Sequence, residues 1–347
     1  MVTPNWKRLK SDAEFRARME KRAAIVSGIR AFFSGQGFIE VETPTVVAFP
    51  GMEPNLDPFR TTILRHDGAK FEAGLITSPE YAMKKLLAAG LPRIFEITRC
   101  YRNGEPWDGA HNPEFTMIEW YRAHADYTAI MQDTEELVGG LAERITGSTT
   151  IRYRGKEIDL SAPWPRMTVA EAMARYAGID LARGIDDPEW FRSAVEAKGC
   201  PTSRNDSFDD VFYRIFLRDV EPDLGVGRPL ILCEYPRSMA ALARLKPGDG
   251  RFAERFEAYC GGMELCNAFS ELCDGAEQRR RLLEEQAQRA GLGRHIHGVD
   301  EQFVEAVGTM PPSAGIALGV DRLVMLLTDA PTIRDVLFFP AGDLFKQ

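Results

Sequence analysis

The feature that most constrains this chain is a pair of distant segments, each of which places an arginine beside a turn or strand. The first begins at Arg102 and runs to Phe115, and the second runs from Gly315 to Arg322. An arginine guanidinium presents a fork of N–H donors that matches phosphate oxygens, and carboxylates beside it can hold magnesium. Two such arginines brought into one site predict a pocket for the polyphosphate of ATP.

Composition narrows the class of protein. Of the 347 residues, 44% are hydrophobic and 27% are charged, as in folded globular proteins. The formal net charge of −8 argues against an extended basic surface for nucleic acid, so an RNA partner is disfavoured. The six cysteines form no C-x-x-C pair, which predicts reduced thiols in the cytoplasm rather than zinc or disulfides. No stretch is apolar enough to predict a membrane span.

Alternating strands and amphipathic helices predict an α+β fold. Residues 93–101 and 115–122 are rich in Ile, Phe, Thr and Tyr and flank a polar turn, which predicts an antiparallel hairpin. Further strands are expected at 230–235, 252–260 and 263–269, with helices at 127–145 and 276–289. The chain has no G-x-G-x-x-G or P-loop motif. We therefore expect an antiparallel sheet flanked by helices, in a single domain covering residues 1–347.

Local signals predict where two helices begin. Ser11 is followed three residues later by Glu14, a capping box that starts the first long helix. A second helix start is expected at Ser78, with Pro79 in the first helical position, where its missing N–H costs nothing.

Other segments carry weaker signals. Residues 38–43 alternate and stop at Pro44, as an edge or interface strand does. Residues 151–160 predict short strands, and Thr168 opens a capping box for another helix. We assign no chemistry to residues 149–228.

Four runs in order along the chain carry more specific motifs. They are TSPEYAMK at 77–84, HNPEFTMIEWYR at 111–122, the segment from Glu254 to Glu271, and GIALGVDRLVMLL at 315–327. Together they resemble the class II aminoacyl-tRNA synthetases, in particular the lysine subgroup and its small paralogues that attach lysine or β-lysine to elongation factor P. The resemblance spans nearly the whole chain and implies a class II catalytic core.

The resemblance implies an ATP site. Arg102 and Arg322 would bind the α-phosphate and the outer phosphates and act in catalysis together with Glu264. Glu257 and Glu264, on strands joined by a glycine turn, would hold Mg²⁺, and Phe115 would stack on adenine. The expected ATP-binding residues are Arg102, Asn103, Gly104, Glu105, His111, Asn112, Phe115, Glu264, Leu265, Gly319 and Arg322.

The resemblance also implies a lysine site. A buried ammonium needs carboxylate partners because an unpaired charge is costly to desolvate. Glu119 and Glu271 would face the side-chain amine, while Glu80 and Asn267 would serve the amino and carboxylate end. The expected substrate-binding residues are Ser78, Pro79, Glu80, Glu119, Tyr121, Asn267 and Glu271.

The resemblance also has implications for the molecule that accepts the lysyl group and for the oligomeric state. Lysyl-tRNA synthetases carry an amino-terminal anticodon-binding barrel, and we expect no such domain here because few residues precede the first expected helix. The run EWYR at 119–122 is closer to the elongation factor P ligases than to the synthetases. Elongation factor P is therefore the expected acceptor in place of tRNA. In this family the segment from Phe38 to Pro44 forms a subunit contact, so a homodimer is expected.

The sequence departs from the family pattern in the second motif and in the pocket. Gly104 stands where the family has glutamate, so either Glu105 takes its place or the acid is lost. Cys266 and Ala268 replace smaller residues, which predicts a narrower or shifted pocket floor and leaves the choice between α-lysine and (R)-β-lysine open. Two other readings stay open: a truncated lysyl-tRNA synthetase-like enzyme that charges tRNA or a small molecule, and a catalytically silent regulatory paralogue.

Overall fold

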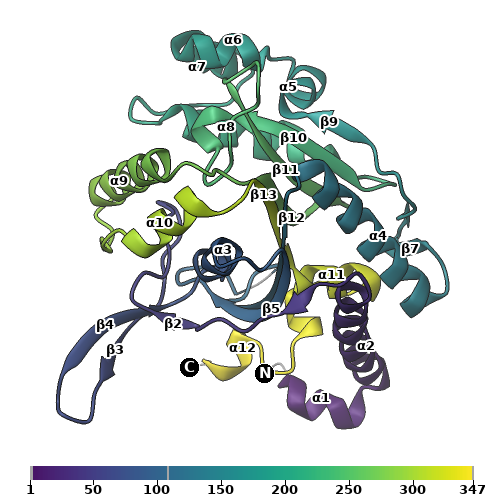
Figure 1. Cartoon of the computed structure of the whole chain (residues 1–347). Helices are drawn as coiled ribbons and strands as arrows, with labels where there is room; N and C mark the ends of the chain where they lie inside the picture. The colour runs from purple at the N-terminus through teal and green to yellow at the C-terminus, as the bar shows by residue number, and fades with distance from the viewer. Residues whose placement is uncertain (1–2, 108, 346–347) are drawn as a thin grey trace.

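The computed structural model describes residues 3–107 and 109–345 and is built around an eight-stranded sheet (Figure 1). Its strands are β1 (Ile39–Glu40), β5 (Arg93–Tyr101), β6 (Glu114–Ala123), β9 (Arg166–Thr168), β10 (Leu230–Pro236), β11 (Phe252–Cys260), β12 (Met263–Ser270) and β13 (Ser313–Gly319). They lie in the order β1-β5-β6-β13-β12-β11-β10-β9. Neighbours from β5 to β10 run antiparallel, whereas β1 and β9 are parallel to their neighbours. The expected antiparallel sheet flanked by helices is confirmed, with a parallel strand at each edge.

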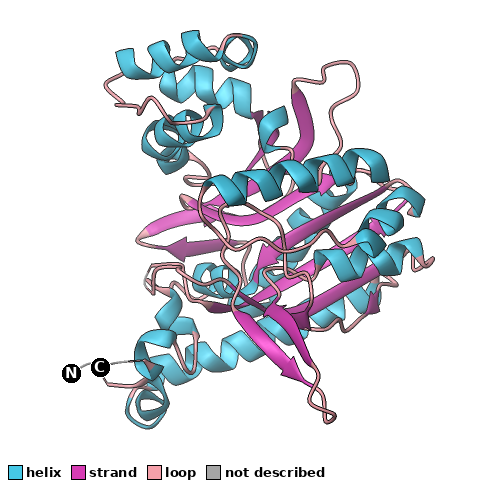
Figure 2. Cartoon of the chain, turned by 90° about the vertical axis from the view of Figure 1, so that its left-hand side faces the viewer, coloured by secondary structure: helices cyan, strands magenta, loops and turns pink. Residues whose placement is uncertain are grey.

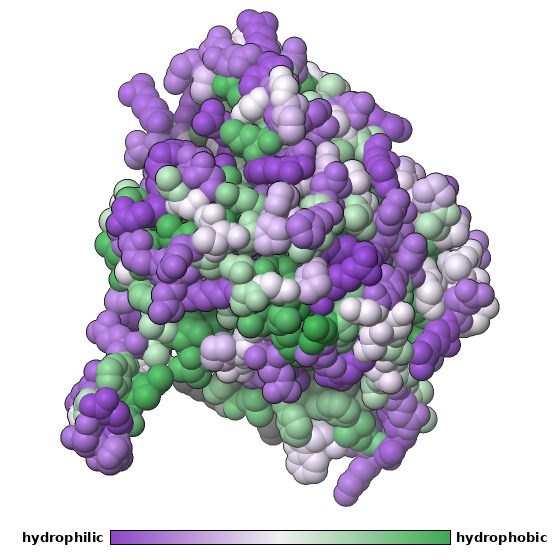
Figure 3. Space-filling view, in the orientation of Figure 1, coloured by the Kyte–Doolittle hydropathy of each residue, from purple (hydrophilic) through white to green (hydrophobic). Residues whose placement is uncertain are grey.

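Two small strand units stand outside this sheet. The strands β2 (Val46–Val47), β3 (Arg60–Leu64) and β4 (Lys70–Leu75) form one, and β7 (Thr150–Tyr153) pairs with β8 (Lys156–Asp159) in the other. The β3–β4 hairpin projects from the body at the lower left of Figure 1. In Figure 3 the same hairpin stands clear of a surface that mixes hydrophilic and hydrophobic residues.

Helices pack on both faces of the large sheet (Figure 2). The α-helices are α1 (Asn5–Ser11), α2 (Ala13–Gly35), α3 (Glu80–Ala88), α4 (Tyr127–Thr146), α5 (Val169–Ala172), α6 (Leu181–Asp186), α7 (Pro188–Ala197), α8 (Phe208–Ile215), α9 (Gly275–Gly291), α10 (Glu301–Thr309), α11 (Val320–Leu327) and α12 (Ala341–Leu344). The helices α2, α4 and α11 bury Phe33, Leu137 and Val324 in the main apolar core with Trp120 of β6. On the other face, α3, α9 and α10 share a smaller core. Within the described residues, no helix is both long and apolar enough to cross a lipid bilayer.

Strand register places polar residues in one row across the sheet. Glu119 of β6 pairs with Ala317 of β13, which pairs with Asn267 of β12, which in turn pairs with Glu257 of β11. Because side chains alternate along a strand, the residues next to this row turn into the core on the other face. The sheet thus presents a polar row toward α3 and α9.

The same alternation corrects the expectation about the pocket floor. Cys266 and Ala268 flank Asn267 in sequence, and both are buried in the core beneath α2, α4 and α11. They point away from the polar row, so the prediction that they narrow the pocket is wrong. The sequence carries no local sign of this, because the face that a residue takes depends on strand register.

Residues 149–228 carry no assigned chemistry. Ile151 and Tyr153 of this range lie in the main core, and the part from Val169 onward builds a separate apolar core. Val169, Phe191, Phe212 and Phe216 are buried there against β10 and β11. The predicted capping box is confirmed, since Thr168 and Glu171 exchange side-chain and backbone hydrogen bonds at the start of α5.

Three predicted element ends differ from the structure. Asp12, not Ser11, caps the first long helix by accepting from Phe15 N at 2.9 Å, while Ser11 ends the short helix α1. Pro79 is the N-cap residue of α3 rather than its first helical residue. Of residues 38–43, Ile39 and Glu40 form strand β1 at the edge of the sheet, as predicted, and Val41 N donates to Phe95 O just beyond it.

Candidate functional site

The inner cavity lies against the polar row of the sheet, beneath α3 and α9. It has a volume of about 150 Å³. The predicted substrate residues Ser78, Glu80, Glu119, Tyr121 and Asn267 all line it, together with Arg102 and Gly315. Long-range register therefore gathers residues from four separate motifs around one cavity.

Glu119 lies on the wall of the inner cavity and is held by two hydroxyl groups. Ser78 Oγ donates to Glu119 Oε1 at 2.6 Å, and Tyr121 OH donates to Glu119 Oε2 at 2.8 Å. Burial raises the pKa of Glu119 to about 8, the charge of Glu80 adds to the rise, and the two hydroxyls oppose it. The carboxyl is a natural partner for a ligand ammonium, which would favour its ionised form.

Lys84 of α3 is a site residue that the sequence analysis missed. Its ammonium is fully buried and lies 2.5 Å from Glu80 Oε1 and 2.5 Å from Glu271 Oε2. Burial lowers the pKa of Lys84, but the charges of Glu271 and Glu80 outweigh it and the net shift is upward. Burial raises the pKa of Glu271 to about 8, and Lys84 opposes this rise. The spacing of Glu80 and Lys84, four residues apart on one helix, was a usable signal.

Gly315 of β13 is needed for the approach of Tyr121 and Glu271. A Cβ atom at this position would lie 2.2 Å from Tyr121 Cε1 and 2.6 Å from Glu271 Oε1. Neither contact is possible between real atoms, so any larger residue would displace the ring or the carboxylate. Gly319 is among the expected ATP-binding residues, whereas no role was predicted for Gly315.

Several predicted nucleotide residues also lie together. Arg322 Nη1 donates to the backbone oxygen of Glu264 at 2.8 Å, and Arg322 Nη2 lies 3.4 Å from His111 Nε2. The guanidinium of Arg102 lies over the ring of Phe115, 5.1 Å from its centroid. The fold thus brings the run at 111–122 next to the run at 315–327, an arrangement that a polyphosphate site requires.

The predicted magnesium pair lies on neighbouring strands β11 and β12. Glu257 accepts from Arg255, Tyr235 and Tyr259, each at 2.6 Å, so much of its lone-pair capacity is used. Glu264 is freer, with 35% of its side chain exposed beside Arg322. Carboxylate oxygens suit Mg²⁺, but no group of three or more His, Cys, Asp or Glu residues in the described chain forms a metal site. A metal at Glu264 would take its remaining ligands from phosphate and water.

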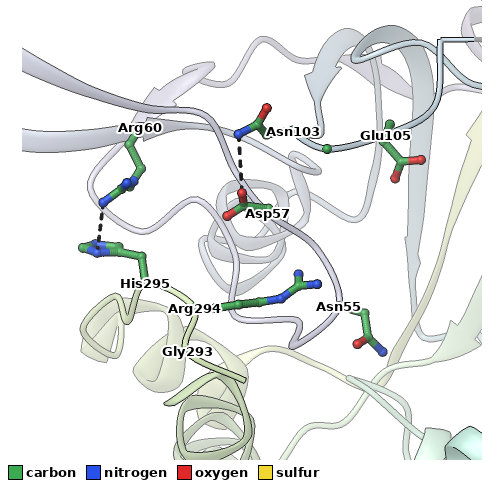
Figure 4. A pocket seen from close by; sticks show the side chains of 9 residues that line it. Asn55, Asp57, Arg60, Asn103, Glu105, Gly293, Arg294 and His295 are labelled. Atoms are coloured by element: carbon green, nitrogen blue, oxygen red, sulfur yellow. Dashed lines mark hydrogen bonds between the residues drawn. The ribbon is translucent and has the colours of Figure 1, made fainter. Parts of the chain in front are cut away.

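The other predicted ATP residues are distributed elsewhere. Asn103, Gly104 and Glu105 line an outer cavity of about 500 Å³ with Arg60 and the loop at 293–295 (Figure 4). Asn103 N donates to the backbone oxygen of Asp57 at 2.7 Å. Gly104 has a φ of 75°, which explains why glycine stands there.

Four further predicted residues have surroundings that define what each could offer a ligand. The side-chain amide of Asn112 is bonded to the backbone of Glu114 and Ala341. The Leu265 side chain is buried in the main core, and Gly319 is the N-cap residue of α11. Asn267 Oδ1 accepts from Arg255 Nε at 2.9 Å while lining the inner cavity. The nucleotide roles of Asn112, Leu265 and Gly319 stay predictions.

Comparison with known proteins places this architecture in a family. Residues 4–343 match the tRNA synthetases of class II (D, K and N), and the chain belongs to that family. A lysine–tRNA ligase from Moorella thermoacetica is 39% identical over 320 residues, covering 92% of this chain and 64% of the relative. A lysine–tRNA ligase from Rhizobium leguminosarum bv. trifolii is 39% identical over 333 residues, covering 95% and 65%. The chain thus spans a little under two-thirds of the length of these relatives.

Proposed function

We propose that this protein is an ATP-dependent ligase that activates lysine or (R)-β-lysine as an adenylate and transfers it to a lysine side chain of elongation factor P. The observation that carries the proposal is the inner cavity. Its wall holds the buried carboxyl of Glu119, bonded by Ser78 and Tyr121, in a site that needs a cation. A primary ammonium with three donors satisfies this need.

In the activation step, the substrate carboxylate attacks the α-phosphorus of ATP and pyrophosphate leaves. Arg102 lines the inner cavity and would orient the α-phosphate, while Arg322 and His111 would bind the outer phosphates. Glu264 and the remaining lone pairs of Glu257 fit Mg²⁺, which would neutralise phosphate charge. Catalysis rests mainly on positioning and charge stabilisation.

In the transfer step, the ε-amine of the acceptor lysine attacks the carbonyl carbon of the adenylate. An amide forms, AMP leaves with the electron pair of the broken C–O bond, and the amine loses a proton to solvent. The acidic balance of the chain and the run EWYR at 119–122 support a protein acceptor.

Transfer to tRNA is the second candidate, because the named relatives are lysine–tRNA ligases. Intact-mass analysis of elongation factor P, incubated with this protein, ATP, magnesium and each lysine isomer, tests the two acceptors beside a tRNA-charging assay. We expect a gain of one lysyl unit on elongation factor P. If tRNA is charged and elongation factor P stays unmodified, tRNA is the acceptor and the second candidate replaces the first. If the adenylate forms but neither product appears, both proposed acceptors are wrong.

A further inference from the structure

Two carboxylates in the inner cavity have no part in the proposed function. Glu53, in the loop before β3, and Glu285, on α9, both line the cavity with Glu80 and Arg102. Tyr81 marks their closeness, because burial and then the charges of Glu53, Glu285 and Glu80 raise its pKa. Three carboxyl groups therefore converge on one end of the cavity.

Glu285 has no direct cation partner among the described residues, although the charges of Arg281 and Arg289 act on it from beyond ion-pair distance. Among residues 3–107 and 109–345, it forms no hydrogen bond and no ion pair within 4.0 Å. The nearest cations are used elsewhere: Arg281 donates to Glu277 and to two backbone oxygens, and Arg289 donates to three backbone oxygens. Burial raises the pKa of Glu285 to about 8, with Glu53 and Glu80 adding to the rise.

Glu53 gives a second, independent sign of a missing cation. Its Oε2 atom is buried and has no hydrogen-bond partner among the described residues. A buried carboxylate oxygen without a donor is costly. A ligand ammonium placed between these groups would supply the cation that Glu53 and Glu285 lack, whereas Glu80 already has Lys84 as a partner.

The position of Arg102 indicates which ligand group reaches this end. Under the proposed function, on which this inference rests, Arg102 faces the α-phosphate and hence the reacting carboxylate of the substrate. Glu53, Glu285 and Arg102 line the same cavity, and the charge of Arg102 acts on Glu53. We therefore assign Glu53 and Glu285 to the carboxylate end of the substrate. Glu119, with its two hydroxyl donors, is left for the distal amine.

We propose that Glu285 is a specificity-determining residue, which with Glu53 and Glu80 binds the amino group nearest the substrate carboxylate. The cavity then selects diamino acids, because each end requires its own ammonium. With the amine on either the α or the β carbon, three carboxylates are available to receive it.

Calorimetric measurement of the binding of L-lysine, (R)-β-lysine and 6-aminohexanoate tests this assignment. The last compound has the distal amine but no amine on the α or β carbon. In the Glu285→Gln variant we expect Kd for both lysines to rise at least about tenfold, as for a charge-assisted hydrogen bond. Kd for 6-aminohexanoate should not change. Glu285→Asp should recover part of the loss, and Glu284→Gln, on the exposed face of the same helix, is the matched control.

Either of two results would overturn the inference: unchanged lysine affinity in Glu285→Gln, or an equal loss for 6-aminohexanoate. If the parent protein binds lysine but forms no adenylate, the proposed function fails while the inference is still judged by binding. If the parent protein binds none of the three compounds, both are overturned.

Discussion

Substitution of Gly315 by alanine should specifically disable the inner cavity. The added methyl would lie 2.2 Å from Tyr121 Cε1 and 2.6 Å from Glu271 Oε1. Because carbon atoms normally pack at about 3.5–4.0 Å, the Tyr121 ring must move by about an ångström or more. That shift breaks the 2.8 Å hydrogen bond from Tyr121 to Glu119.

The expected size follows from the lost contact. A hydrogen bond to a charged group contributes about 1.5–3 kcal/mol, so KM for lysine in ATP–pyrophosphate exchange should rise about 10- to 100-fold. Forcing the methyl into the site should also cost about 1–3 kcal/mol of unfolding free energy. The KM for ATP should change little, since the residues around Arg322 are untouched.

Gly140→Ala provides the matched control. Gly140 lies in α4, and a Cβ there would meet no atom within 4 Å. Its KM for lysine should equal that of the parent, and its stability should stay level or rise by up to about 1 kcal/mol. If Gly315→Ala kept the parent KM for lysine, the placement of Tyr121 and Glu119 as amine-binding residues would be refuted.

Three further predictions follow from the charges in the two sites. Lys84→Met leaves Glu80 and Glu271 without their cation, so the unfolding free energy at pH 8 should fall by about 3–5 kcal/mol in denaturant titration; the loss should shrink at pH 6, because burial raises the pKa of Glu271 to about 8 and this carboxyl is then protonated, and a pH-independent loss would contradict the pairing. Glu264→Gln should raise the magnesium concentration needed for half-maximal pyrophosphate exchange, whereas Glu271→Gln should chiefly raise KM for lysine; parent-like behaviour of both variants would disprove the two assignments. Lysine binding at pH 7 should release protons, because Glu119 has a pKa of about 8 when free and must lose its proton beside an ammonium. Affinity should therefore improve as pH rises from 6 to 8. Calorimetry in phosphate and Tris should give different binding heats, and identical heats would contradict the prediction.

The strands of the sheet could be predicted closely from the sequence. The pattern at 93–101 matches β5, and the patterns at 252–260 and 263–269 match β11 and β12 within one residue. These signals are local, because alternation and glycine turns act over a few neighbouring residues. Gly261 and Gly262 both adopt a positive φ at the turn between β11 and β12.

The full set of residues around the cavity could not be predicted from local sequence patterns, because it depends on strand register and on helix packing. Cys266 was placed in the pocket because it neighbours Asn267, but the register of β12 turns it into the core. Lys84 was missed although Glu80 lies four residues before it, and Glu285 was missed because the charged residues of its helix resemble any solvated face. Only the packing of α3 and α9 over the sheet shows that Lys84 is buried between Glu80 and Glu271 and that Glu285 lines the cavity.

Amino-acid-dependent ATP–pyrophosphate exchange tests the central claim most directly. The assay compares L-lysine and (R)-β-lysine with norleucine, which has the six-carbon chain of lysine and lacks the distal amine that Glu119 is proposed to bind. Exchange with at least one lysine isomer and none with norleucine is the predicted result. Equal exchange with norleucine, or no exchange with any of the three, would contradict the account.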